Sequence, residues 1–175
     1  TERIIKELDS GKVPVVAGFQ GVSLSGEITT LGRGGSDTTA AALGVALNAE
    51  VVEIYTDVDG VMTDDPRIVP LARRLSMLSY REVVEMALLG AKVIHPRAVE
   101  IAMLGRIPLR IRKTGSEDEG TLVTDEPLEA RQALSRGVRI KGDRVVTGIA
   151  HISGMAQVKI KPSSDFISES ESCLE

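Results

Sequence analysis

The chain has 175 residues, 42% hydrophobic and 26% charged, so it can form a globular core and does not fit a disordered or coiled-coil class. Its 21 basic and 25 acidic residues give a net charge of −4, and only 2% of its residues are aromatic, which argues against nucleic-acid binding. Its single cysteine, Cys173, cannot form an internal disulfide, and no run approaches the ~18 apolar residues of a membrane span. We therefore expect a cytoplasmic protein that binds neither nucleic acid nor membranes.

The first third of the chain alternates between predicted helices and strands. In order, we expect a helix over 1–9, a buried strand over 13–19, a glycine-rich loop over 18–26, a helix capped by Ser36 or Asp37 that runs to about Asn48, and a strand over 51–56. A strand, a glycine-rich turn, a helix and a second strand in one short stretch predict a right-handed βαβ unit of a parallel sheet.

The middle of the chain continues this alternation. We expect two helices and two strands, over 80–89, 96–105, 107–111 and 121–124. Ser79 and Glu82 form a capping-box pattern at the start of the first helix, and Pro96 suits the first turn of the second. The pattern predicts an α/β layered domain over residues 1–124 rather than an antiparallel barrel.

After residue 124 the composition changes. We expect a helical connector over 125–143 with an exposed helix at 127–136, a unit at 144–161 that holds a strand pair over 145–149 and 156–161, and a disordered tail over 162–175.

The segment Gly32-Arg33-Gly34-Gly35-Ser36-Asp37-Thr38-Thr39 is the most informative part of the sequence. Backbone amides at adjacent glycines and at a helix N-terminus attract anions, because they lack intrahelical partners and the helix dipole adds partial positive charge. Arg33 adds a planar guanidinium that suits a carboxylate. The alternative is a tight turn in which the glycines provide only conformational freedom and Ser36 or Asp37 only caps the helix.

Polar residues also follow the strand over 51–56. The sequence Thr56-Asp57-Val58-Asp59-Gly60 stands at the carboxyl end of that strand, where open α/β sheets bind their ligands. Asp64-Asp65-Pro66-Arg67 then adds charges in an irregular loop. Both segments are equally consistent with solvated surface turns.

Lys92 follows the predicted helix over 80–89 and has small and apolar neighbours on both sides. Most lysines only extend into water, but this setting is unusual for one. His95 is expected to start a helix or to pack, because no cysteine, histidine or aspartate stands at metal-ligand spacing from it. With His151 as the only other histidine, we expect no zinc site, no Ser-His-Asp triad and no metal-binding residues.

In this order and spacing, these motifs resemble the aspartate kinases of the amino acid kinase family. The resemblance covers about residues 13–124 and rests on Gly18-Phe19-Gln20-Gly21, residues 26–40, residues 54–61, Asp65-Pro66-Arg67, Lys92 with His95-Pro96, and Gly120-Thr121-Leu122. It implies a three-layer α/β sheet with helices on both faces, present here as a partial domain. Residues 146–150 also resemble the first strand of the family's regulatory ACT domains, which implies a fragment of an ACT-like α+β domain.

The resemblance implies transfer of the γ-phosphoryl group of ATP, used with Mg²⁺, to the β-carboxylate of L-aspartate. The product is 4-phospho-L-aspartate, at the first step of lysine, threonine and methionine biosynthesis. A carboxylate nucleophile is already ionised at neutral pH and needs no catalytic histidine. The implied partners are ATP and L-aspartate, lysine or threonine as an effector, and further chains in a homo-oligomer or in a pair with a complementary chain.

The resemblance also assigns roles to residues. Arg33, Gly34, Gly35 and Ser36 would bind aspartate, and Arg33 would pair with a substrate carboxylate. Asp37 would orient the catalytic lysines, and Lys92 would contact the migrating phosphate, so Asp37 and Lys92 are the predicted catalytic residues. The predicted nucleotide-binding residues are Thr56, Asp57, Met62, Asp64, Asp65, Pro66, Arg67, Lys92 and Val93.

The sequence departs from the family pattern at two places. Many members have tyrosine where this chain has Met62. The family's N-terminal Lys-Phe-Gly-Gly-Ser/Thr phosphate loop does not occur in the sequence, so we expect the chain alone to be inactive. The alternatives are a non-catalytic regulatory or interaction fragment, and another member of the amino acid kinase family.

Overall fold

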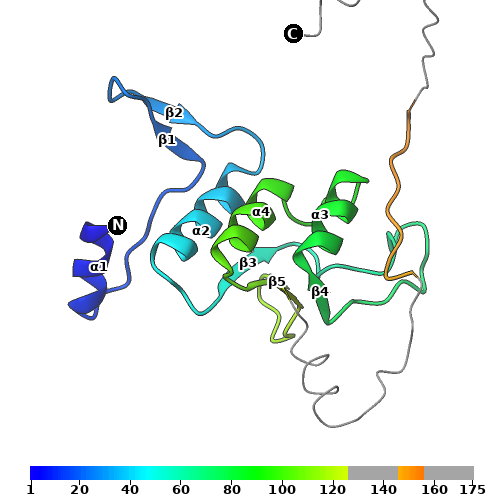
Figure 1. The fold of residues 1–175 in the computed structure, drawn as a ribbon. Coiled ribbons are helices and arrows are strands. Elements are labelled where there is room, and N and C mark those ends of the chain that lie inside the picture. The colour runs from blue at the N-terminus through cyan, green and yellow to red at the C-terminus, as the bar shows by residue number, and fades with distance from the viewer. Residues whose placement is uncertain (126–145, 156–175) are drawn as a thin grey trace, which may run out of the picture.

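A four-stranded mixed sheet forms the centre of the computed structural model, which describes residues 1–125 and 146–155 (Figure 1). In spatial order its strands are β3 (Val52–Thr56), β5 (Leu109–Lys113), β6 (Thr121–Thr124) and β4 (Met77–Ser79). β3 is parallel to β5 and β4 is parallel to β6, whereas β5 and β6 are antiparallel. The loops that follow β3 and β5 therefore leave the sheet at one edge, which is where ligands of such sheets bind.

Three helices pack over one face of this sheet: α2 (Gly35–Ala46), α3 (Tyr80–Leu88) and α4 (Pro96–Gly105). α4 packs against both α2 and α3 (Figure 1). α2 lies close to β3 at Gly44, where any side chain would collide with Val52. The covered face carries the alternate strand residues, since successive side chains of a strand point to opposite faces. The largest fully buried apolar side chains of this core are Tyr80, Leu78, Leu109, Ile111, Val99 and Val123.

The other face of the sheet carries polar side chains. Glu53 and Tyr55 of β3 lie beside Arg110 and Arg112 of β5 in the parallel register. The Tyr55 hydroxyl donates to Glu53 at 2.7 Å, and Arg112 donates to the same carboxylate at 3.3 Å. These elements form the mixed α/β fold that the sequence predicts, although the described helices that pack on this sheet cover one face rather than the expected two. None of the helices in residues 1–125 and 146–155 is long and apolar enough to cross a membrane.

The helices predicted over 1–9, 80–89 and 96–105 are present in the structure. α3 begins with the predicted capping box, in which Ser79 Oγ accepts from Glu82 N at 3.3 Å and Glu82 Oε2 accepts from Ser79 N at 2.8 Å. α4 has Pro96 in its first turn and ends at Gly105. α1 (Glu2–Asp9) forms at the N-terminus but has no buried residue. The short strand β4, directly before the capping box, was not predicted.

The predicted strand over 13–19 is wrong. Its residues form no strand in the structure, and Val13 and Val15 are 88% and 96% exposed. An apolar run becomes a buried strand only where a neighbouring strand takes its backbone hydrogen bonds. Within the described part of the chain, no strand pairs with residues 13–19. The predicted βαβ unit that used this strand is wrong for the same reason.

The region predicted as a glycine-rich loop contains an antiparallel hairpin. β1 (Gln20–Val22) pairs with β2 (Ile28–Thr30), and Gly26 turns the chain between them with φ +86°. The hairpin extends away from the main sheet (Figure 1). Its three-residue strands are too short to show the alternation from which a strand is predicted.

Residues 146–155 run as an extended segment beside α3 and the loop after β3 (Figure 1). Ile149 N donates to Thr63 O at 2.9 Å, and Thr147 Oγ1 donates to Glu82 Oε1 at 2.8 Å. The predicted strand over 145–149 is wrong over residues 146–149, because among the described residues this segment makes one backbone bond and forms no ladder. The predicted helix at 127–136, the strand over 156–161 and the tail lie outside the described residues.

Candidate active site

A tight turn, residues 32–37, leads the chain into α2 and is called the glycine turn below. Gly34 is the N-cap residue of α2 and has φ +71°, in the left-handed region that favours glycine. Gly35 N donates to Gly32 O at 3.0 Å and closes the turn. The prediction that Ser36 or Asp37 caps the helix is wrong, because the chain reverses at the glycines and both polar residues already lie in the first helical turn.

The glycine turn presents groups that attract anions. The amides of Ser36 and Asp37 make no backbone hydrogen bond within the described residues, as expected for the first turn of a helix. The dipole of the 12-residue helix adds partial positive charge at this end. The exposed side chain of Arg33 stands directly before it. This arrangement suits a carboxylate or a phosphate.

The hairpin braces the glycine turn from one side. Gly35 is buried, and a Cβ there would lie 2.9 Å from Phe19 Cδ2 and 3.0 Å from Leu31 Cβ. Phe19 itself has φ +70°, and its amide donates to Thr39 Oγ1 of α2 at 3.2 Å. Position 35 therefore requires glycine, and the chain on both sides of the hairpin holds the turn in place.

The second part of the site is the irregular connection between α3 and α4, residues 90–95, called the lysine segment below. Gly90 has φ +114° and lies so close to His151 O that a side chain would collide with it. Lys92 is exposed, whereas Ile94 is 5% exposed and anchors the segment in the core. The segment thus holds Lys92 at the surface between two packed helices.

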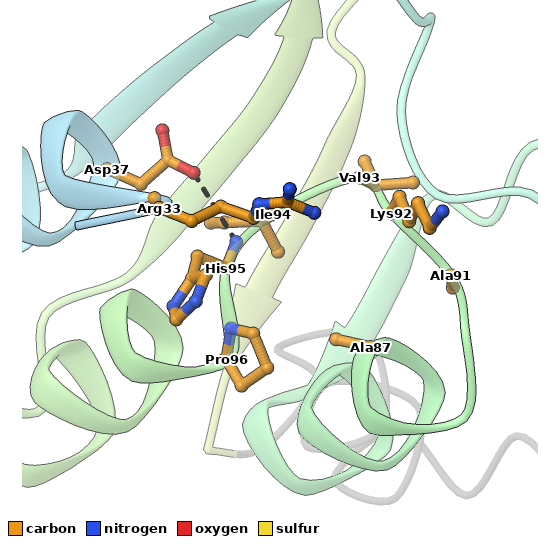
Figure 2. A pocket seen from close by; sticks show the side chains of 10 residues that line it. Arg33, Asp37, Ala87, Ala91, Lys92, Val93, Ile94, His95 and Pro96 are labelled. Atoms are coloured by element: carbon orange, nitrogen blue, oxygen red, sulfur yellow. Dashed lines mark hydrogen bonds between the residues drawn. The ribbon is translucent and has the colours of Figure 1, made fainter.

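The glycine turn and the lysine segment form a single pocket of about 290 Å³ (Figure 2). Figure 2 shows the Arg33 side chain extending across it toward Val93. The pocket is lined by Arg33, Gly34, Asp37, Ala87, Ala91, Lys92, Val93, Ile94, His95 and Pro96. Two cationic side chains from elements distant in sequence therefore share one cavity with the open end of α2.

Two hydrogen bonds fix the wall of this pocket. His95 N donates to Asp37 Oδ2 at 3.3 Å, so the first turn of α2 is tied to the start of α4 (Figure 2). The imidazole of His95 caps α4, since its Nδ1 accepts from Arg97 N at 3.3 Å. The helix-start role predicted for His95 is confirmed. Its place in the pocket wall was not predicted, because the contact joins residues far apart in sequence.

The pocket brings together five of the predicted site residues: Arg33, Gly34, Asp37, Lys92 and Val93. Gly35 and Ser36 belong to the same turn but do not line the cavity. The other predicted nucleotide-binding residues also lie outside its lining.

Thr56 and Asp57 stand at the carboxyl end of β3. Thr56 Oγ1 donates to Asp57 Oδ1 at 3.1 Å, and the Thr56 carbonyl accepts from Thr114 N at 2.9 Å. Asp59 and Lys113 form an ion pair of 3.5 Å at the same edge. Sequence reasoning missed Lys113, although its place at the end of the strand parallel to β3 would have pointed to it.

The loop after β3 holds the remaining predicted residues. Met62 forms an isolated bridge with Arg74, and Asp64 Oδ1 accepts from Asp65 N at 2.7 Å. Arg67 pairs with Asp65, with Nη2 2.7 Å from Oδ2. The hydrogen bonds from the Arg67 side chain and backbone lower the pKa of Asp65 to about 2. Pro66 is exposed between the two paired residues.

The sequence of the chain matches the Amino acid kinase family over residues 1–113. Aspartokinase 1 of Bacillus subtilis (strain 168) is 49% identical over 159 residues, which cover 91% of this chain and 38% of that protein. The chain thus spans less than half the length of this curated relative.

Solved structures of aspartate kinases also resemble this chain. Aspartate kinase from Synechocystis matches with a TM-score of 0.63 and 55% identity, over 71% of this chain and 21% of that one. E. coli aspartokinase III in complex with aspartate and ADP matches with a TM-score of 0.59 and 45% identity, over 63% of this chain and 25% of that one. The same E. coli protein in complex with lysine and aspartate gives a TM-score of 0.56.

Proposed function

The chain belongs to the amino acid kinase family, and from this premise we propose that it is part of an aspartate kinase. Such an enzyme transfers the γ-phosphoryl group of ATP to the β-carboxylate of L-aspartate and gives 4-phospho-L-aspartate and ADP. The observation that carries the proposal is the 49% identity with aspartokinase 1 of Bacillus subtilis across 91% of this chain. The geometry of the pocket supports it, because a turn that suits a carboxylate and a lysine line one cavity.

The glycine turn is the aspartate half of the proposed site. Arg33 pairs with a carboxylate of the substrate through two parallel N–H donors, which a guanidinium can supply. Gly34 and Gly35 form the turn, which leaves the amides of Ser36 and Asp37 at the open end of α2, where a carboxylate oxygen is favoured. Asp37 accepts from His95 N and so orients the lysine segment relative to this turn.

Lys92 is the phosphoryl half of the proposed site. In the reaction a β-carboxylate oxygen of aspartate attacks the γ-phosphorus, and the bond from that phosphorus to the β,γ-bridging oxygen breaks, which releases ADP. The carboxylate is already ionised at neutral pH, so no general base is needed. Catalysis therefore depends on alignment and on positive charge at the transferring phosphoryl group, which the ammonium of Lys92 supplies.

The nucleotide half uses the carboxyl end of β3 and the loop that follows it. Thr56, Asp57, Met62 and Val93, with residues 64–67, border the nucleotide in this proposal. The support is their position, because the loops after β3 and β5 leave the sheet at one edge. Lys113 lies at that edge and adds a cation.

Mg²⁺ would arrive with the nucleotide. The described residues hold no group of three or more histidine, cysteine, aspartate or glutamate side chains that could form a protein cage for a metal ion. Magnesium at phosphate sites takes most of its ligands from phosphate oxygens and water and only one or two from carboxylates. The carboxylates of Asp57 and Asp59 fit this limited role, and when bound the ion neutralises phosphate charge.

The regulatory and cellular context is also part of the proposal. We assign lysine as the first effector to test, because E. coli aspartokinase III has been solved with lysine and aspartate. Threonine is the alternative. A cytoplasmic setting and a homo-oligomer, or pairing with a complementary chain, complete the proposed context.

A thermal-shift panel tests the proposed substrate class. A ligand that binds only the folded chain raises its melting temperature, and the rise grows with the logarithm of ligand concentration divided by Kd once the ligand is in excess. We expect a rise with aspartate plus Mg-ADP and none with glutamate, N-acetylglutamate or UMP. A rise with UMP or glutamate in place of aspartate would assign the chain to another branch of the family. No shift with any of these would favour a non-catalytic role.

A further inference from the structure

We propose that His95 is a positioning residue that holds the glycine turn against the lysine segment. It thereby keeps the aspartate half and the phosphoryl half of the site at a fixed distance from each other. The inference rests on the proposed function, because it explains how that site is assembled. It is carried by contacts that His95 makes to both ends of the turn.

The first contact is steric. Gly34, the N-cap of α2, lies so close to the Cβ, Cγ and Cδ2 atoms of His95 that any side chain at position 34 would collide with the imidazole. Gly34 thus serves two purposes, since it also adopts φ +71°. The ring of His95 fills the space that this missing side chain leaves.

The second contact is polar. His95 N donates to Asp37 Oδ2 at 3.3 Å, so one residue touches the turn at both its N-cap and its first helical turn. A single contact would leave the turn free to pivot about it. Two contacts, three residues apart on the turn, fix both its distance and its orientation.

The imidazole is itself held in place. Its Nδ1 accepts from Arg97 N at 3.3 Å, so the ring cannot rotate without opening the start of α4. α4 is anchored in the core, where Ala98 and Val99 are fully buried. In the neutral ring the proton then lies on Nε2.

Lys92 precedes His95 by three residues and lies in irregular backbone. Its position depends on the two ends of the lysine segment, which are the end of α3 and His95. A residue that only started α4 would need an acceptor for Arg97 N and no contact with Gly34. The contact with the glycine turn is therefore what distinguishes a positioning role from an ordinary helix cap.

A double-mutant cycle on this 175-residue chain tests the contact. His95→Gly removes every His95 atom that a side chain at position 34 would meet, and glycine is tolerated at an N-cap, whereas Gly34→Ala introduces the collision. We expect the folding equilibrium constant of the double variant to exceed the additive value about tenfold, because His95→Gly removes the collision. His151→Gly, in the same cycle with Gly34→Ala, is the matched control and should be additive. Additivity with His95→Gly, or a double variant that is no more stable than Gly34→Ala alone, would overturn the inference.

A binding measurement tests the positioning role itself. Aspartate is titrated calorimetrically into the His95→Ser chain in the presence of Mg-ADP. The temperature is kept well below the unfolding midpoint of the variant, so that a loss of stability alone does not change the measured affinity. We expect a roughly tenfold or greater rise in the aspartate Kd, since small displacements of binding groups are costly. His95→Asn, which keeps a planar acceptor, should restore part of the affinity.

An unchanged Kd in a folded His95→Ser chain would show that His95 only caps α4 and would overturn the inference. If the parent chain binds neither aspartate nor Mg-ADP, the proposed function is wrong and the inference falls with it. The two failures are distinguishable, because the first requires a parent chain that binds.

Discussion

Asp37 accepts a 3.3 Å hydrogen bond from the backbone N–H of His95, which lies 58 positions later in the chain. This bond joins the first turn of α2 to the start of α4, two helices that also pack against each other. It ties together the two segments that carry Arg33 and Lys92, which line the same pocket. The site therefore depends on one helix pair more than on the sheet below it.

Arg33→Lys should weaken aspartate binding by roughly tenfold while changing nucleotide affinity by less than about twofold. The reason is that an ammonium cannot reproduce the two parallel hydrogen bonds that a guanidinium gives a carboxylate. Calorimetric titrations with aspartate and with Mg-ADP measure the two affinities separately. Arg97→Lys, on the exposed side of α4, is the matched control. Equal losses for both ligands would contradict the assignment of Arg33 to aspartate.

Lys92→Met should act mainly on the rate of phosphoryl transfer. In an aspartokinase of full length that contains this segment, we expect kcat to fall roughly 100-fold or more with smaller changes in both KM values, because the charge is needed chiefly in the transition state. A coupled assay of ADP release measures these constants. Lys6→Met, on the exposed helix α1, is the control. An unchanged kcat would make Lys92 an ordinary surface lysine.

Arg67→Ala should alter the response of stability to acid. The hydrogen bonds from Arg67 lower the pKa of Asp65 from 3.8 to about 2, so this pair stabilises the fold above pH 4. The contribution is lost as the pH falls from about 4 to about 2, because the unfolded chain takes up the proton first. In Arg67→Ala the pKa of the Asp65 carboxyl, followed by NMR, should rise toward 3.8. The free energy of unfolding should then fall less steeply between about pH 4 and about pH 2 than it does in the parent chain. An unchanged carboxyl pKa would contradict the pairing.

Tyr80→Phe should destabilise the core by about 1–2 kcal/mol, because it leaves a buried carbonyl without its partner. Tyr80 is 1% exposed and its hydroxyl donates to Ile107 O at 2.8 Å. Burial raises the pKa of Tyr80 to about 12, so the hydroxyl keeps its proton. Tyr55→Phe, on the exposed sheet face, is the control and should change stability by less than about 0.5 kcal/mol. Urea unfolding followed by circular dichroism compares the two, and equal losses would contradict the account.

The parts of the fold that local signals determine could be predicted. Ser79 with Glu82, and Pro96, mark the starts of α3 and α4 because helix caps are satisfied by residues within one turn. The strand predicted over 13–19 could not be judged in this way, since a buried strand depends on partners elsewhere in the sequence. The cap of α2 was misplaced because a glycine with positive φ took the position predicted for Ser36 or Asp37.

Part of the candidate pocket could be predicted from the sequence. Arg33, Asp37 and Lys92, which the sequence motifs single out, line one cavity in the structure. The contact between Gly34 and His95 could not be foreseen, because neither residue carries a local signal of its partner. The pairing of Asp65 with Arg67, in contrast, follows from their proximity in a short turn.

In the proposed site, aspartate binds between the glycine turn and the lysine segment. The most direct test is to titrate L-aspartate, with Mg-ADP present, into the ¹⁵N-labelled chain and to follow the backbone amide shifts. We predict saturable shifts at Arg33, Gly34, Ser36 and Lys92, and none on the polar sheet face at Arg110. Shifts confined to other parts of the chain, or no saturable shift at all, would contradict the account.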